Sequence, residues 1–294
     1  MYWCCSVESE RRARMVCQRL DIPFYVINME KEFKKKVVDY FIAEYKAGRT
    51  PNPCVICNYE IKFGFLIDKA LKMGREFIAT GHYARISNDK LLKGIDKDKD
   101  QSYFLWKLSQ KQLKRVLFPV GGYKKSEVRA LAKKFDLPTA ETPESQEVCF
   151  ITDSTNEFLR KYIKNKPGKI ILKNKIIGEH NGLWFYTIGQ RKGIKLSGGP
   201  FYVIDKDMKK NALIISKDKR DLLKKELAAR DINWISKVKF PLRVEAKIRY
   251  RHKSAKAVVN KNKVVFDNPQ RAITSGQSVV FYNKEELLGG GIIV

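Results

Sequence analysis

The chain has 294 residues, of which 44 % are apolar and 11 % aromatic, which is enough for ordinary hydrophobic cores and argues against disorder. Its length predicts two or three domains, and no apolar run is long enough to span a bilayer. The net charge of +27, from 59 basic and 32 acidic residues, indicates a polyanionic partner, although a lysine-rich solvated surface would give the same total.

The first half of the sequence alternates between helix and strand patterns. In chain order we expect a helix at 8–20, a short buried strand at 24–27, a helix at 31–46, a helix from 58 to about 72, a strand at 77–80, a helix at 128–135 and a strand at 148–151. This alternation predicts a parallel sheet. Such sheets place their sites at the carboxyl ends of the strands, where Gly81 and His82 would lie.

The second half has a different residue pattern. Short runs rich in β-branched and aromatic residues alternate with turn residues, which predicts two small β-rich domains, the last of them a β-barrel. We place the three domains at 1–157, 158–217 and 218–294. Residues 155–294 contain 31 basic and 12 acidic residues, against 28 and 20 in residues 1–154, so the excess charge favours a phosphate-binding face in the β-rich part.

The cysteines and the first residues indicate the compartment. Six cysteines are too few for a disulfide scaffold in a chain of this length, and a reducing compartment would keep them as thiols. Residues 1–5 have neither the basic nor the apolar region of a signal peptide. A cytoplasmic location with no membrane partner is therefore the expectation.

Three cysteines are candidates for chemistry. Cys57 directly precedes the expected helix start at Asn58, where unpaired N–H groups would stabilise its thiolate, although a buried structural cysteine is the common alternative. Cys54 and Cys57 form a C-x-x-C pair, and with Cys149 they could supply three thiolates to an iron–sulfur cluster. Spacing alone leaves thiol chemistry and cluster binding open, and Cys149 by itself fits a core strand.

Several long segments together resemble the tRNA-specific 2-thiouridylase family (the MnmA type). They are collinear and span nearly the whole chain: GRTPNPCVICNYEIKF at 48–63, ATGHYARI at 79–86, KDKDQSYFLWKLSQ at 97–110, LFPVGGYKKSEVRALA at 117–132, SQEVCFI at 145–151, GLWFYTIGQRKGI at 182–194 and KIRYRHK at 247–253. The resemblance implies an α/β domain of the HUP type (adenine nucleotide α-hydrolase-like), with an incomplete parallel sheet, before the two β-rich domains.

The resemblance also implies a reaction. Family members adenylate the C2 oxygen of the wobble uridine in certain tRNAs with ATP and Mg²⁺, which turns oxygen into a leaving group. Sulfur from a sulfur-relay protein or a cysteine desulfurase then sits as a persulfide on the cysteine matched by Cys149. The thiol matched by Cys57 acts as the second catalytic cysteine and resolves the persulfide through a transient disulfide.

Matched positions imply further site residues. Gly81 falls at the nucleotide, and the positions that match contacts to the tRNA or its target base are Asn52, Pro53, Cys54, His82, Lys99, Asp100, Gln101, Arg249, Tyr250 and Gln277. For each of them, the alternative to a binding role is an ordinary solvent-exposed surface residue. Residues 237–263 support the match, because they contain ten Lys or Arg and a single acid, Glu245.

The sequence departs from the family pattern at two places. Many members have an aspartate where this chain has Cys54, and this cysteine would complete a three-thiol set for a [4Fe–4S] cluster. The family's Gly-rich SGGVDS-type loop, which wraps the ATP phosphates, is absent from the 294 residues, so we expect little or no product from this chain. Two other functions therefore remain alternatives, namely a non-catalytic tRNA-binding remnant and an iron–sulfur electron-transfer protein.

Overall fold

The structure, a computed structural model, describes residues 7–142 and 148–294 of the chain. These residues fold into two compact units. Of the described residues, the first unit takes in 7–39, 53–142, 148–152 and 285–287, and the second takes in 40–52, 153–284 and 288–294. Each unit is therefore assembled from segments that lie far apart in the sequence.

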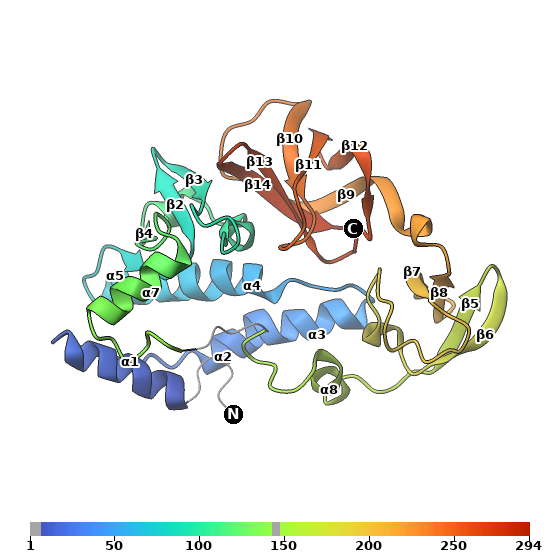
Figure 1. Ribbon diagram of the computed structural model, residues 1–294, viewed down its shortest axis with the longest axis horizontal. Coiled ribbons are helices and arrows are strands. Elements are labelled where there is room, and N and C mark those ends of the chain that lie inside the picture. Colours follow the sequence, from blue (N-terminus) through green and yellow to red (C-terminus); the bar gives the residue numbers. More distant parts are fainter. Residues whose placement is uncertain (1–6, 143–147) are drawn as a thin grey trace. The chain divides into compact units, whose positions relative to one another are not determined.

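Helices dominate the first unit (Figure 1). They are α1 (Val7–Arg19), α2 (Glu30–Phe33), the π-helical η1 (Lys34–Val38), α4 (Pro53–Ile56), the π-helical η2 (Cys57–Phe65), α5 (Leu66–Lys72), the 3-10 helix η3 (Ser102–Leu105), α6 (Gln110–Leu113) and α7 (Lys125–Lys134). Their most deeply buried side chains include Phe33, Ile61, Phe63, Tyr103 and Trp106. The apolar patterns at 31–46 and 58–72 thus mark core helices, as predicted.

Two of the predicted helices consist of several segments in direct succession. The helix predicted at 31–46 is formed by α2, η1 and α3 (Asp39–Lys46), and it ends before Gly48, whose φ of +77° suits a glycine after a helix. The helix that contains Cys54 and Cys57 is formed by α4, η2 and α5, and it begins at Pro53 instead of Asn58.

The π-helical segment η2 has specific support from Gln112. The side-chain amide of Gln112 donates to the carbonyl oxygens of Tyr59 at 3.1 Å and Phe63 at 2.8 Å, which satisfies main-chain acceptors inside η2. Ser109 and Gln112 form a reciprocal capping box at the start of α6, which holds Gln112 in place. This contact fixes the turn of helix on which Lys62 lies.

The strands of the first unit are short. Strands β1 (Ile78–Ala79) and β4 (Val116–Leu117) pair in parallel, which confirms the strand predicted at 77–80 and the parallel arrangement. Strands β2 (Ala84–Ser87) and β3 (Lys90–Lys93) form an antiparallel hairpin, whose two turn residues, Asn88 and Asp89, both have positive φ. The first residues of β14 (Glu286–Ile293) pair with β3.

Two strands predicted in this half are wrong. Residues 24–27 are irregular, with Tyr25 and Val26 exposed, because no segment of the described chain pairs with them and a strand needs partners for its N–H and C=O groups. Residues 148–151 form a turn that buries Phe150 and Ile151, so an apolar run can be buried without strand pairing. Helices α1 and α7 match their predicted ranges, but neither contains a buried residue.

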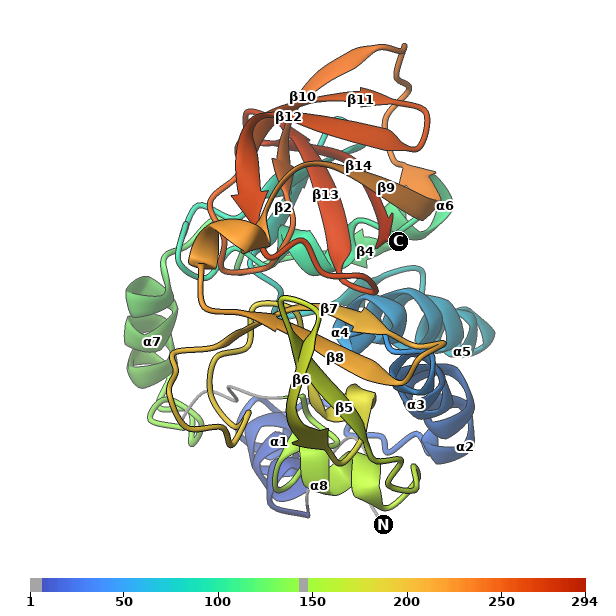
Figure 2. The same cartoon turned by 90° about the vertical axis from the view of Figure 1, so that its right-hand side faces the viewer.

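The second unit contains a four-stranded sheet in the order β6-β5-β8-β7 (Figure 2). Its strands are β5 (Gly168–Leu172), β6 (Lys175–His180), β7 (Tyr202–Asp207) and β8 (Ala212–Ser216). Strands β5 and β8 run parallel, and the other pairs are antiparallel. The short helices of this unit are α8 (Thr155–Arg160), η4 (Leu183–Phe185) and η5 (Lys219–Leu222).

A closed barrel forms the rest of the second unit. Its strands are β9 (Leu223–Trp234), β10 (Leu242–Lys247), β11 (Ala255–Asn260), β12 (Lys263–Arg271), β13 (Ser278–Asn283) and β14, in the order β13-β10-β11-β12-β9-β14, and β13–β14 pairing closes it. Alternate residues such as Val244, Ala246 and Ile248 are buried in its core. The predicted C-terminal barrel is confirmed. No helix within the described residues is both long and apolar enough to cross a membrane.

Candidate functional site

The C-x-x-C cysteines lie in the first turns of a helix. Pro53 is the first helical residue, so the unpaired N–H groups of the helix start belong to the residues directly after it, beginning with Cys54. Cys54 is exposed, whereas Cys57 lies inside the helix and is only 8 % exposed. The predicted position of Cys57 directly before a helix start is therefore wrong, and Cys54 is the cysteine in the first turn.

Lys62 is the charged group that acts on Cys54. Although Cys54 is partly open to solvent, desolvation by the surrounding protein raises the pKa of its thiol, and the positive charge of Lys62 opposes this shift. Lys62 lies eight residues further along the same helix, and long helical side chains point back toward the helix N-terminus. In the part of the chain that the structure describes, no carboxylate forms an ion pair with Lys62.

Lys62 also contacts His82, which follows strand β1. The Lys62 Nζ lies 3.5 Å from Nε2 of His82, and Nδ1 of His82 lies 2.8 Å from Oγ1 of Thr80. Because an ammonium group only donates, Nε2 accepts, and the ring proton on Nδ1 is donated to Thr80. Desolvation and the charge of Lys62 lower the pKa of His82 to about 3, so the imidazole is neutral near pH 7.

His82 lies in an apolar environment, which is unusual for a residue that contacts nucleic acid. Its ring is buried and lies 5.7 Å from the ring of Phe63 and 5.9 Å from that of Phe118, between ring centroids. A buried neutral imidazole contributes no positive charge to a phosphate. A role of His82 toward tRNA stays a prediction.

Gly81 lies exposed at the carboxyl end of β1. A Cβ built on it would meet no atom within 4 Å, so nothing in the fold requires a glycine at this position. An open, side-chain-free backbone at the end of a parallel strand is what a bound phosphate or nucleotide needs for close approach. This geometry suits the nucleotide position that the sequence predicted.

The loop with Lys99, Asp100 and Gln101 is held from within. The buried Asp100 accepts hydrogen bonds from the backbone N–H of Gly94 at 3.1 Å, from that of Ser102 at 3.0 Å and from the Ser102 hydroxyl at 3.1 Å. Gln101 exchanges two hydrogen bonds with the main chain of Tyr83, at 3.0 and 2.9 Å. Both side chains therefore shape the loop, and Lys99 is the half-exposed cation that the loop presents.

The segment before Cys54 is fixed by residues of the barrel. The Gln277 amide donates to the carbonyl oxygens of Thr50 at 2.8 Å and of Pro51 at 3.4 Å, and the N–H of Thr50 donates to the carbonyl of Ser275 at 2.9 Å. Asn52, which follows, is half-buried, and Pro53 is buried. The main chain directly before Asn52 is therefore anchored by hydrogen bonds.

Arg249 and Tyr250 have different surroundings. One guanidinium nitrogen of Arg249 donates to the carbonyl oxygens of Ile188 and Ala272, at 3.0 and 3.1 Å, and to the Thr274 hydroxyl at 2.6 Å. Tyr250 is half-buried, and the ammonium of Lys247 lies 5.6 Å from its ring centroid. Arg249 thus joins loops of the second unit in addition to carrying charge.

Cys149 lies in the turn at 148–151 and is exposed. The next residue, Phe150, is buried, and its ring packs edge-on against Phe33 at a centroid distance of 5.8 Å. Part of the matched segment at 145–151 lies outside the described residues. The role of Cys149 in sulfur transfer stays a prediction.

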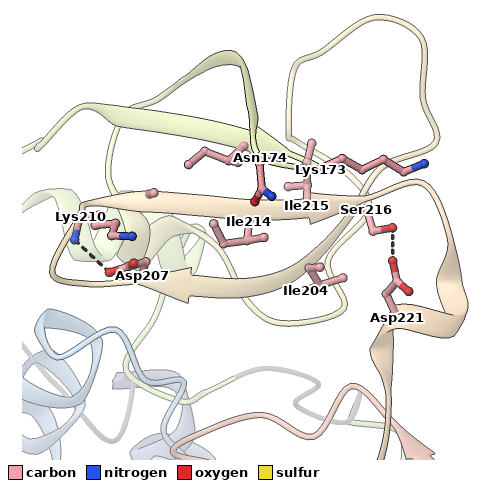
Figure 3. A pocket seen from close by; sticks show the side chains of 11 residues that line it. Lys173, Asn174, Ile204, Asp207, Lys210, Ile214, Ile215, Ser216 and Asp221 are labelled. Atoms are coloured by element: carbon pink, nitrogen blue, oxygen red, sulfur yellow. Dashed lines mark hydrogen bonds between the residues drawn. The ribbon is translucent and has the colours of Figure 1, made fainter.

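Three cavities in the described residues have no predicted site residue in their lining. One of them, of about 380 Å³, lies in the four-stranded sheet of the second unit and is lined by Ile204, Ile214 and Ile215 and by the polar Lys173 and Lys210 (Figure 3). Among the same described residues, no three His, Cys, Asp or Glu side chains come together so that they could hold a metal ion. Cys54, Cys57 and Cys149 are thus not gathered as cluster ligands.

Comparison with known proteins decides the family. Three family models match the chain, the tRNA methyl transferase HUP domain at 1–153, the tRNA methyl transferase PRC-barrel domain at 156–217 and the aminomethyltransferase β-barrel domain at 224–293. A tRNA-specific 2-thiouridylase MnmA 2 of Thermoanaerobacter sp. (strain X514) is 47 % identical over 308 residues, which cover 99 % of this chain and 84 % of the relative. The chain belongs to the tRNA-specific 2-thiouridylase family.

Other members of the family agree. The 2-thiouridylase MnmA of Carboxydothermus hydrogenoformans is 46 % identical over 311 residues, and that of Acetivibrio thermocellus is 45 % identical over 308 residues. Each alignment covers 99 % of this chain and 84 % or 86 % of the relative. The family predicted from the sequence is confirmed, and so is the order of an α/β domain and two β-rich domains.

Sequence reasoning missed two features of this family member. Lys62 stands in the matched segment at 48–63, but nothing in its spacing showed that its ammonium contacts His82 and that its charge acts on the thiol of Cys54. Glu44 is buried between Arg49 and Arg230, and only the fold brings these residues together. A lysine two turns after a helix-start cysteine would have been the one available signal for the first feature.

Proposed function

We propose that this protein is an enzyme that replaces the C2 oxygen of a tRNA uridine, the wobble uridine, with sulfur. The observation that carries the proposal is identity of 45–47 % to tRNA-specific 2-thiouridylases across 99 % of the chain. The exposed Cys54 in the first turn of a helix supports it.

We assign the activating step to the carboxyl end of β1. ATP, with Mg²⁺, would supply the adenylyl group that makes the C2 oxygen a leaving group. Gly81 would let the nucleotide approach the backbone, because no side chain and no neighbouring atom occupies that space.

We assign sulfur transfer to Cys149 and Cys57. The outer sulfur of a Cys149 persulfide attacks C2, and AMP leaves with the electron pair of the C–O bond. The Cys57 thiolate then attacks the Cys149 sulfur, so the electron pair of the S–S bond stays on the sulfur bound to C2. The resulting Cys57–Cys149 disulfide takes up two electrons from a dithiol reductant before the next turnover.

We propose that tRNA binds along basic and anchored segments. The stretch at 237–263, with ten basic residues and one acid, would neutralise backbone phosphates and supply Arg249 and Tyr250. Asn52, Pro53 and Cys54 would lie at the target base. Lys99 would contact tRNA directly, while Asp100 and Gln101 would hold its loop in place. His82 would act mainly through Lys62, and Gln277 would act mainly through Thr50.

An iron–sulfur mechanism is the second candidate for sulfur delivery, with Cys54, Cys57 and Cys149 as ligands to a [4Fe–4S] cluster. The described residues do not favour it, because Cys57 is buried while Cys54 and Cys149 are exposed, and the three do not form a ligand group. Anaerobic reconstitution with iron and sulfide, followed by visible absorption, tests it. A stoichiometric charge-transfer band that is lost in Cys54→Ser would favour the cluster.

The partners and location follow from this chemistry. The sulfur would come from a sulfur-relay protein or a cysteine desulfurase, and the enzyme would act in the cytoplasm on its tRNA substrates.

The test uses enzyme in excess over unmodified tRNA, with ATP, Mg²⁺, cysteine and a cysteine desulfurase. We expect a mass increase of one sulfur on the Cys149 peptide, and 2-thiouridine in low yield after nuclease digestion. Cys149→Ser should lose both signals, whereas Cys57→Ser should keep the persulfide and lose the product. Product that survives both substitutions, or the absence of both signals from the unsubstituted protein, would contradict the proposal.

A further inference from the structure

Lys62 occupies a distinctive place between two groups that the proposed reaction uses. Its ammonium lies 3.5 Å from Nε2 of His82, the residue directly after Gly81, and its charge also acts on the thiol of Cys54. Gly81 is the proposed nucleotide position, and Cys54 adjoins the proposed position of the base. Lys62 thus contacts the residue after Gly81, and its charge also reaches Cys54.

The surroundings of Lys62 leave its charge uncompensated. Within the described chain, no carboxylate forms an ion pair with it, whereas Lys36 of η1 pairs with Glu60 at 3.2 Å. His82, its hydrogen-bond partner, is neutral because desolvation and Lys62 lower the pKa of the imidazole to about 3. A half-buried ammonium beside a neutral acceptor attracts an anion strongly, since little water screens it.

The position of the ammonium is fixed on two sides. The imidazole is held by Thr80 at 2.8 Å and by the rings of Phe63 and Phe118, so Nε2 is a rigid acceptor. The helix turn that contains Lys62 is held by Gln112, through the carbonyl oxygens of Tyr59 and Phe63. Fixed donors aimed at developing charge are the arrangement that stabilises a transition state.

We propose that Lys62 is a catalytic residue whose ammonium binds the phosphate of the adenylated uridine and stabilises it as AMP leaves. The inference rests on the proposed function. As the sulfur–C2 bond forms and the C2–oxygen bond breaks, the electron pair of that bond moves onto the phosphate oxygen of AMP. The Lys62 ammonium donates a hydrogen bond to this phosphate and keeps its own proton, so it adds no atom to the product. His82 is a positioning residue, because it acts through Lys62.

The first measurement is single-turnover kinetics of the full 294-residue chain and of Lys62→Met, Lys62→Arg and the control Lys72→Met, an exposed lysine at the end of α5. Pyrophosphate release reports adenylation, and 2-thiouridine reports sulfur transfer. For Lys62→Met we expect 2-thiouridine formation to fall on the order of a hundredfold, with pyrophosphate release within about threefold of the unsubstituted protein. Lys62→Arg should recover most of the loss, and Lys72→Met should show none.

A second measurement does not depend on turnover. Binding of AMP alone, followed by titration calorimetry, should weaken at least about fivefold in Lys62→Met, and thermal melting should show that this variant is folded. Equal AMP affinity in Lys62→Met and the unsubstituted protein, AMP binding by neither, or an equal loss of pyrophosphate and 2-thiouridine overturns the inference. If AMP affinity falls as expected while the unsubstituted protein makes no 2-thiouridine, the anion site stands and the proposed function fails.

Discussion

The side-chain amide of Gln277 donates a hydrogen bond to the carbonyl oxygen of Thr50 at 2.8 Å. The two residues are 227 positions apart in the sequence, and Thr50 also donates its N–H to Ser275. A loop of the C-terminal barrel therefore fixes the main chain a few residues before Cys54. The segment at 40–52 and the barrel loop thus hold each other within the second unit.

Replacement of Gln277 by Ala should loosen this segment without unfolding the protein. Loss of one such hydrogen bond costs about 0.5–1.5 kcal/mol, so the melting temperature should change little, while the amide of Thr50 should exchange faster with deuterium. Hydrogen–deuterium exchange measured by mass spectrometry would report this. Gln270→Ala is the matched control, because its amide donates to nearby Asn268, and it should leave the exchange of 49–52 unchanged.

Glu44 should be far more important for stability than a surface carboxylate. It is buried, and its two oxygens accept hydrogen bonds from Arg49 at 2.6 and 2.7 Å and from Arg230 at 3.1 Å. Desolvation raises the pKa of Glu44, but these hydrogen bonds and the two positive charges outweigh it and lower the pKa. The carboxylate is therefore charged and fully paired in the folded state.

Removal of that carboxylate should cost about 2–3 kcal/mol in Glu44→Ala, somewhat less than for a fully buried pair, because both arginines are about one-third exposed and can be rehydrated. Glu226→Ala is the control, since Glu226 pairs with Lys263 at the surface, and it should change the free energy of unfolding by less than about 1 kcal/mol. Urea unfolding of both variants would measure the difference. An equal loss of unfolding free energy in the two variants would show that the buried Glu44 contributes no more to stability than a surface carboxylate.

Local patterns in the sequence predicted the elements that depend on local interactions. The four-residue steps of Phe33, Val37 and Phe41 marked a core helix, and the alternation in 244–248 marked a barrel strand. The segment at 24–27 has the same apolar character as a strand, but strand formation depends on a partner, and no described segment supplies one. Pairing is a property of distant segments, so a local pattern cannot establish it.

The site shows the same division. The family motifs single out Cys54, Cys57 and Gly81, but the sequence predicts the helix start at Asn58, five residues after the Pro53 at which the helix begins, because a proline suits a stiff loop as well as a first helical residue. The first turn of the helix therefore contains Cys54 and not Cys57. The contact of Lys62 with His82 joins residues from a helix and from the end of a strand, and only the fold reveals it.

His82 should make the protein more sensitive to acid. Its pKa is about 3 in the folded protein and near 6.5 in an unfolded chain, so the unfolded state binds more protons between these values. Its contribution to stability is therefore fully present above pH 6.5 and is lost progressively as the pH falls toward 3. At pH 4.5 the loss relative to pH 7 is about 2–3 kcal/mol.

The variant His82→Asn cannot titrate in this range. Its free energy of unfolding should fall less steeply between pH 6.5 and 4.5 than that of the unsubstituted protein, whatever its value at pH 7. Urea titrations at several pH values would give both slopes, and the other titrating groups cancel in the comparison. Parallel slopes would mean that His82 is protonated in the folded state.

Gly81 and Gly121 offer a matched test of whether a glycine is kept for folding or for binding. A Cβ at Gly121 would overlap the carbonyl oxygen of Ala84, so Gly121→Ala should destabilise the protein by about 1–3 kcal/mol. A Cβ at Gly81 would meet nothing, so Gly81→Ala should melt at the temperature of the unsubstituted protein. If the space beside Gly81 receives the nucleotide, Gly81→Ala should nevertheless weaken AMP binding and slow pyrophosphate release. A variant that is as stable and binds AMP as tightly as the unsubstituted protein would remove Gly81 from the nucleotide site.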